Sequence, residues 1–307
     1  MAAAPASAAT TPRRGRFGLR EEWITGYLAV FPTAAFFLIF VVFPVAYSLW
    51  LSTQNWDGMS PDRRFVGLRN YERMLDQPLF WRSMAQTGVF IAGLVPARMA
   101  LALGLALLLN QKIRGLAVYR TLYFMPVVTS TIAVSIVWIW IFDPTWGVAN
   151  WLLELLGLPT SQWLSDPNTA LPSLIVMTIW KTVGFEMVIY LAGLQGIPTS
   201  LYEAAAIDGA GRWRQFWHIT LPLLMPTTFF ILVTAIINAA QIFDQVFVMT
   251  QGGPLRSTYV IIYYLYEEGF RFFRMGYAAA LAWVVFAVVL VLTLLQWRFL
   301  RRDVAVG

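Results

Sequence analysis

The amino-acid sequence predicts an all-α membrane protein with six transmembrane helices. Of its 307 residues, 59% are hydrophobic and only 12% are charged, a balance outside the usual range of soluble domains. Six apolar runs are each close to or above the roughly 20 residues that a helix needs to cross a bilayer. Because these runs are continuous instead of alternating, they argue against a transmembrane β-barrel. The six predicted spans are 27–51, 86–109, 118–142, 170–194, 222–247 and 276–298.

The distribution of positive charge predicts the orientation of the chain. Residues 1–26 form an Ala-rich and Pro-rich tail with four arginines, and the first apolar run is expected to be retained as a span because no Ala-x-Ala cleavage site follows it. Six spans place both ends on one side, and that side carries twelve Lys or Arg in its tails and connections against eight on the other. Loop 143–169 carries none. Because Lys and Arg favour the cytoplasmic side, tails 1–26 and 301–307 and connection 198–222 are predicted to be cytoplasmic.

The residue inventory argues against several kinds of chemistry. The chain has no cysteine and a single histidine, His218, so disulfides, thiolate metal sites and histidine-based catalytic sites are not expected. The sequence contains no G-x4-GK[ST] phosphate loop, no HExxH and no G-x-S-x-G. We therefore expect no enzyme activity, no metal and no cofactor in this chain. The arginines at span ends account for the net charge of +6 better than nucleic-acid binding does.

Residues 198–222 are predicted to fold as a helical hairpin between two spans. Ser200 and Glu203 have the spacing of a capping box, which favours a first helix over 201–208. Two glycines then break this helix, and a second helix is expected over 212–219, ending before Leu221-Pro222. Aromatic side chains at i, i+3 and i+4 form a stripe on this second helix, namely Trp213, Phe216 and Trp217.

The same stretch contains the pattern EAA-x3-G-x9-I-x-LP without a gap, beginning at Glu203 and ending at Pro222. It resembles the EAA loop of binding-protein-dependent ABC importer permeases, a cytoplasmic coupling helix that inserts into a cleft of the ATP-hydrolysing subunit. The predicted cytoplasmic position of the loop agrees with this resemblance. The residues that it assigns to coupling are Glu203, Ala204, Ala205, Asp208, Gly209, Arg212 and Arg214.

The resemblance extends over about residues 27–300. The segments PVAYSLWLS, FVGLRNY and IFDQVFVMTQGGP are similar to carbohydrate-type permeases, most of all to the first permease of maltose-type sugar importers. This implies a five-helix permease core preceded by one N-terminal span, located in the bacterial cytoplasmic membrane. It also implies four kinds of partner: a second homologous permease, two copies of an ATPase that binds the ATP, an extracytoplasmic solute-binding protein, and the lipid bilayer.

Polar residues inside the predicted spans are candidates for the substrate pathway, because polar groups are costly in a bilayer. Arg98 lies in the second run and Asp244 near the outer end of the fifth. Asn238, Gln241 and Asp244 are three residues apart and are expected on one flank of a helix. By resemblance to maltose-type permeases, the sugar contacts are assigned to Thr178, Lys181, Thr182, Phe185, Asn238 and Gln241.

Structural interpretations of these polar groups stay open at this point. In-span polar side chains often only hold helices together. Pro126 with the hydroxyls of Thr129, Ser130 and Thr131 predicts a kink in which the hydroxyls satisfy freed carbonyls. Lys181 is a departure from a plain sugar site and favours an acidic sugar or a polyol phosphate.

The outer loops and the solute leave further alternatives. Residues 65–84 mix aromatic and charged groups and predict a short surface helix. The cluster of Trp138, Trp140, Trp146, Trp151 and Trp163 is typical of an interfacial aromatic belt, with a protein-docking surface as the alternative. The predicted function is import of a sugar or sugar-like solute. The alternatives are a permease for glycerol-3-phosphate-type phosphodiesters and an ion-coupled secondary transporter that uses Lys181, Glu186 or Asp244.

Overall fold

The computed structural model describes residues 16–111 and 114–304, and the chain divides into two compact units, residues 1–51 and 52–307. In the first unit an α-helix, α1 (Arg16–Phe37), continues through a π-helical turn, η1 (Leu38–Val42), into α2 (Phe43–Ser52). The helical segment Gly26–Ser52 is long and apolar enough to cross a membrane. Residues 1–15 of the predicted N-terminal tail 1–26 and residues 305–307 of the predicted C-terminal tail 301–307 lie outside the described residues, whereas 16–26 belong to α1 and 301–304 continue a later helix of the chain.

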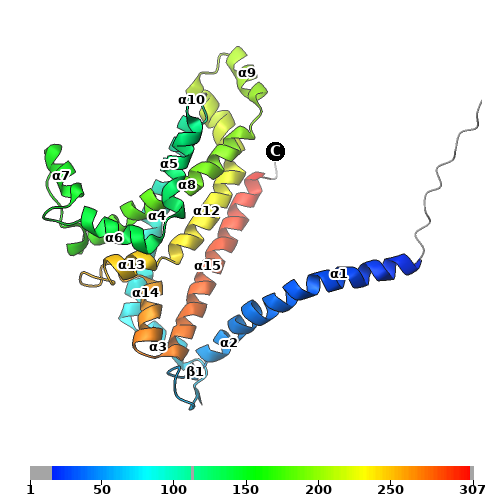
Figure 1. Ribbon diagram of the computed structural model, residues 1–307, viewed down its shortest axis with the longest axis vertical. Coiled ribbons are helices and arrows are strands. Elements are labelled where there is room, and N and C mark those ends of the chain that lie inside the picture. Colours follow the sequence, from blue (N-terminus) through cyan, green and yellow to red (C-terminus); the bar gives the residue numbers. More distant parts are fainter. Residues whose placement is uncertain (1–15, 112–113, 305–307) are drawn as a thin grey trace, which may run out of the picture. The chain divides into compact units, whose positions relative to one another are not determined.

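The second unit is built on long helices that pack side by side (Figure 1). Helix α4 (Pro78–Leu109) packs along α8 (Ala170–Gln195) and α12 (Met225–Ala240), and α12 packs along α15 (Met275–Val304). Helix α4 begins eight residues before the apolar run predicted for it, because Pro78 starts a helical turn at its N-terminus. Among the described residues, five helices are long and apolar enough to span a membrane, which confirms the all-α fold class.

A sixth candidate span is sharply bent. Helices α5 (Leu116–Val128) and α6 (Thr131–Ile141) pass the same length and composition test together, but their axes differ by 99°. The hydroxyl of Thr129 donates to the carbonyl of Pro126 at 2.6 Å, as the kink prediction required. The bend is far larger than a proline kink, so the run predicted as 118–142 is not one continuous helix.

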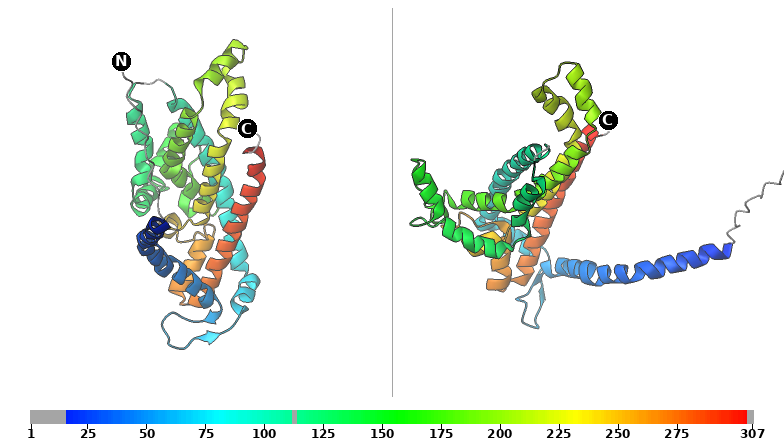
Figure 2. Two further views of the ribbon diagram at one scale, coloured as in Figure 1. Left: turned by 90° about the vertical axis from the view of Figure 1, so that its right-hand side faces the viewer. Right: turned by 45° about the horizontal axis from the view of Figure 1, so that its top comes forward.

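The two ends of the second unit carry different short elements. At one end are an antiparallel ribbon, β1 (Gln54–Asn55) with β2 (Arg64–Phe65), and helices α3 (Arg69–Asp76) and α14 (Ile261–Tyr266), the latter followed by the π-turn η4 (Glu267–Arg271). The opposite end carries α9 (Thr199–Ile207) and α10 (Arg212–Gln215) (Figures 1 and 2). Helix α15 ends on the side of α9. The predicted hairpin and the ribbon are therefore on opposite sides of the bundle.

The loop after α6 has its own scaffold. It contains α7 (Val148–Leu155) and a 3₁₀ turn, η2 (Trp163–Ser165). The buried side chain of Asn150 donates to the carbonyls of Pro144 and Ser161 and accepts from the indole of Trp163 at 2.7 Å. Trp163 also stacks on Phe142. The predicted tryptophan cluster therefore divides: Trp138 and Trp163 pack inward, whereas Trp140, Trp146 and Trp151 are exposed.

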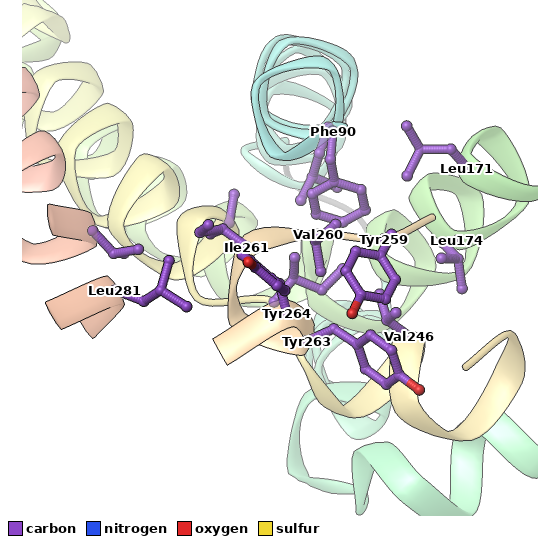
Figure 3. Packing of buried hydrophobic residues seen from close by; sticks show 14 of the residues in the cluster. Phe90, Leu171, Leu174, Val246, Tyr259, Val260, Ile261, Tyr263, Tyr264 and Leu281 are labelled. Atoms are coloured by element: carbon purple, nitrogen blue, oxygen red, sulfur yellow. The ribbon is translucent and has the colours of Figure 1, made fainter. Parts of the chain in front are cut away.

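The largest core cluster joins α4, α8, α14 and α15 (Figure 3). Phe90 is fully buried, and Tyr263 and Tyr264 are 2% exposed. Nearby, the phenol of Tyr259 donates to the carboxylate of Glu267. Burial is the main reason, and this hydrogen bond the second, that the pKa of Tyr259 is raised far above its usual value. Aromatic packing thus fixes the end of the bundle that carries the ribbon.

Candidate functional site: a mid-bundle pocket and an exposed hairpin

A pocket of about 380 Å³ lies between α4, α6, α8 and the C-terminal end of α12. Its lining is rich in neutral polar side chains, contributed by three separate segments of the chain. They are Thr131, Thr178, Thr182, Asn238, Gln241 and Gln245. Phe90 and Phe243 add aromatic surface, and Arg98 and Asp244 are the charged members.

The wall formed by residues 238–245 is a break in a helix. Helix α12 ends at Ala240 and α13 (Asp244–Met249) begins after Phe243, whose φ of −143° and ψ of −59° leave the helical region. The expectation that Asn238, Gln241 and Asp244 share one flank of a continuous helix is therefore wrong. All three nevertheless line the pocket, and all three are exposed. Exposed polar groups at this depth need water, a solute or another subunit to satisfy them.

On α8 the predicted pathway residues divide into two pairs. Thr178 and Thr182 line the pocket, and their hydroxyls donate to the carbonyls one turn earlier at 2.7 and 2.6 Å. Lys181 is only 7% exposed and does not line the pocket. Phe185 is 46% exposed and also lies outside the lining. The pathway role of all four stays a prediction.

A buried ion pair joins α4 to α8 beside the pocket. The guanidinium of Arg98 lies 2.7 Å from a carboxylate oxygen of Glu186, and both side chains are 5% exposed. Arg98 also donates to the hydroxyl of Thr182 at 3.0 Å. The pair is not fully satisfied, because Nε of Arg98 and Oε2 of Glu186 are buried without a hydrogen-bond partner.

Most of the predicted coupling residues are exposed on the surface of the hairpin. Glu203, Ala204 and Asp208 on the first helix are exposed, Ala205 is half-buried, and Ile207 at its tip is 87% exposed. Gly209, Arg212 and Arg214 follow on the exposed turn and second helix. The phenol of Tyr202 bonds the hydroxyl of Thr220 at 2.9 Å, which ties the two arms together. Six of the seven residues are thus exposed, and they lie on consecutive segments of the hairpin.

Two local predictions for the hairpin are wrong. Pro198, with extended backbone, occupies the N-cap of α9, and no side chain caps the helix, so the Ser200–Glu203 capping box does not form. The second arm does not end at residue 219. It continues from α10 through a π-turn, η3 (Phe216–Thr220), into α11 (Leu221–Leu223). The aromatic stripe is confirmed, since Trp213 packs against both Phe216 and Trp217.

Sequence reasoning did not identify two sets of pocket-lining residues. Thr131 and Gln245 line the pocket, but the sequence marks Thr131 only as part of a kink and Gln245 only as a member of the segment IFDQVFVMTQGGP. A larger pocket of about 530 Å³ lies beside α3 at the ribbon end, where Arg69, Glu72 and Arg73 line it. Among the described residues, no group of three or more His, Cys, Asp or Glu side chains is placed to hold a metal ion.

Comparison with known proteins finds a family model and several relatives that all describe membrane components of transport systems. The family model described as "Binding-protein-dependent transport system inner membrane component" matches residues 98–303. The trehalose/maltose transport system permease protein MalF of Thermococcus litoralis is 35% identical over 283 residues, covering 91% of this chain and 95% of the relative. The sn-glycerol-3-phosphate transport system permease protein UgpA of Pectobacterium atrosepticum is 33% identical, covering 93% and 96%.

A solved structure agrees over nearly the whole chain. It is a chain of a bacterial alginate ABC transporter, crystallised in complex with an alginate pentasaccharide-bound periplasmic protein. The TM-score is 0.81 at 25% sequence identity, and the match covers 94% of this chain and 98% of that chain.

Proposed function

The chain belongs to the binding-protein-dependent transport system inner membrane component family, and from this premise we propose that it is one of two permeases of an ATP-driven importer for a sugar or sugar-like solute. The observation that carries the proposal is the pairing of an exposed hairpin at one end with a polar pocket at mid-bundle. The hairpin receives movement from an ATPase, and the pocket forms half of the passage.

The exposed polar groups of the passage support a second permease. Asn238, Gln241 and Asp244 lie within a candidate membrane span and are open to the surroundings of this chain. Lipid offers such groups no hydrogen-bond partners. A homologous permease facing this surface would enclose them in a polar channel between the two subunits.

The remaining partners follow from the two ends of the bundle. Two copies of an ATPase subunit bind the ATP on the cytoplasmic side, where Glu203 and Asp208 anchor the hairpin and Arg212 and Arg214 meet acceptors on the ATPase. A solute-binding protein docks on the opposite, outer face. The charge distribution of the loops supports a cytoplasmic location for both termini. The relative crystallised with a periplasmic protein supports the binding-protein partner.

Deletion of Glu203–Gly209 tests the coupling role. The loop lies outside the candidate spans, so we expect normal membrane insertion but loss of ATPase co-purification and of ATP-driven uptake. A deletion of equal length in the N-terminal tail, residues 2–8, serves as the control and should leave both intact. Uptake that survives the hairpin deletion, or uptake driven by an ion gradient without ATP, would refute the proposal.

A glycerol-phosphate permease is the second candidate, since a permease for sn-glycerol 3-phosphate is a relative of similar identity. The two candidates share the coupling mechanism and differ in the charge of the solute. The charges around the pocket distinguish them.

A further inference from the structure

We propose that the mid-bundle pocket passes an uncharged, polyhydroxylated solute and disfavours anions. The inference rests on the proposed function, because it takes the pocket to be part of the passage. It is not implied by family membership, since relatives are named for neutral trehalose and maltose and for the anions glycerol 3-phosphate and alginate.

The cation that lines the pocket is already engaged. One terminal nitrogen of Arg98 contacts Glu186 at 2.7 Å, and the other donates to Thr182 at 3.0 Å. Its Nε is unpartnered, but it is buried from any solute. An anion that recruited Arg98 would have to compete with a carboxylate held in place by α8, and would leave Glu186 as an uncompensated buried charge.

The second cation on the inner part of the bundle, Lys181, does not line the pocket. Lys181, the residue whose presence in the sequence favoured an acidic or phosphorylated solute, lies outside the lining and is 7% exposed. Asp244 is the charged group that is both exposed and on the lining. The four charges around the pocket therefore balance, and the one presented to the solute is negative.

The rest of the lining suits hydroxyl groups. Asn238, Gln241 and Gln245 each offer amide donors and acceptors, and Thr131 adds a hydroxyl. Phe90 and Phe243 supply flat apolar surface for the C–H face of a sugar ring. The exposed carboxylate of Asp244 lies on the same lining and repels an anion. A neutral polyol pairs with these groups and incurs no such repulsion.

The sign of the potential in the pocket tests this directly, without knowledge of the natural solute. The chain has no cysteine, so Gln241→Cys introduces a single thiol on the lining. The purified complex of both permeases and the ATPase is treated in detergent with a cationic (trimethylammonioethyl) or an anionic (sulfonatoethyl) methanethiosulfonate. The ratio of the two rate constants is compared with the ratio for 2-mercaptoethanol. The same complex without the substitution gives the background.

We expect the cation-to-anion ratio at position 241 to exceed that of the free thiol severalfold, and Asp244→Asn in the same background to bring it back toward the free-thiol value. A ratio at or below that of the free thiol overturns the inference. Asn238→Cys is the second variant if the first does not assemble, and it carries the same expectation.

Uptake into proteoliposomes that contain the binding protein separates this inference from the proposed function. ATP-driven import of sn-glycerol 3-phosphate in preference to trehalose refutes the neutral solute and leaves the importer intact. Labelling with the expected ratio, in a complex that imports no solute with ATP, refutes the importer and leaves the charge of the pocket as stated.

Discussion

Arg98 and Glu186 face each other across α4 and α8 at 2.7 Å, with both side chains 5% exposed. Removing one partner of a buried pair typically costs about 3–5 kcal/mol, because the other charge is left uncompensated. We therefore expect Arg98→Gln or Glu186→Gln alone to lower the midpoint of thermal unfolding in nanodiscs substantially. The double variant Arg98→Leu/Glu186→Leu should unfold at a higher temperature than either. If the two single variants and the double variant all lowered the unfolding midpoint equally, the charges of the pair would contribute nothing beyond packing.

Gly184 sets the distance between α8 and α5. A Cβ at this position would collide with the backbone carbonyl of Tyr123 on α5, which cannot move without displacing the helix. We expect Gly184→Ala to destabilise the protein by about 1–3 kcal/mol, the usual cost of overpacking. Gly104→Ala in α4 is the matched control, since no atom lies within 4 Å of its Cβ position. Similar unfolding midpoints for the two variants would contradict the close contact.

Gly209 ends the first arm of the hairpin with a φ of +78°, whereas Gly211 has a φ of −68°. A left-handed residue other than glycine costs roughly 1–2 kcal/mol, and Asn tolerates this conformation best. Gly209→Ala should therefore reduce ATP-driven uptake by disturbing the turn, with Gly209→Asn close to the parent. Gly211→Ala should have little effect. An equal loss from both alanine variants would show that the turn conformation is not what matters.

The Tyr259 phenol and the Glu267 carboxylate predict an alkaline limit of stability. Burial and this contact raise the pKa of Tyr259, so the folded protein holds this proton more tightly than the unfolded chain. The resulting stabilisation is complete below about pH 10 and is lost progressively as the pH rises above it. Glu267→Gln removes the negative charge beside the phenol and should therefore lower the pKa of Tyr259. Tyrosinate absorbance titrations of the parent, Glu267→Gln and Tyr259→Phe measure the shift; identical curves for the first two would contradict it.

Much of the fold could be predicted because apolar length is a strong signal. The first, second, fourth, fifth and sixth runs each contain a helix long enough to span, and the pattern from Glu203 to Pro222 marked the exposed hairpin. The size of the bend after Val128 could not be predicted. Pro126 indicates a kink, but not an angle of 99°, and the contact of α6 with α13 is a tertiary one that the local sequence does not specify.

The site could be predicted only in part, for two physical reasons. The break between Ala240 and Asp244 contains no Gly or Pro, so local sequence gave no reason to interrupt the helix. Thr131 reaches the pocket only through tertiary packing, far from Asn238 in the sequence. The capping box predicted for Ser200 and Glu203 also fails for a local reason: α9 begins at Thr199, so Pro198 and not Ser200 occupies the N-cap position.

The bend between α5 and α6 has a mechanical consequence. When two rigid helices are joined at nearly a right angle, a shift of one helix along its own axis displaces the other helix perpendicular to that helix's axis. Because α6 starts at Thr131, which lines the pocket, a small shift of α5 along its axis would change the width of the pocket without unwinding either helix.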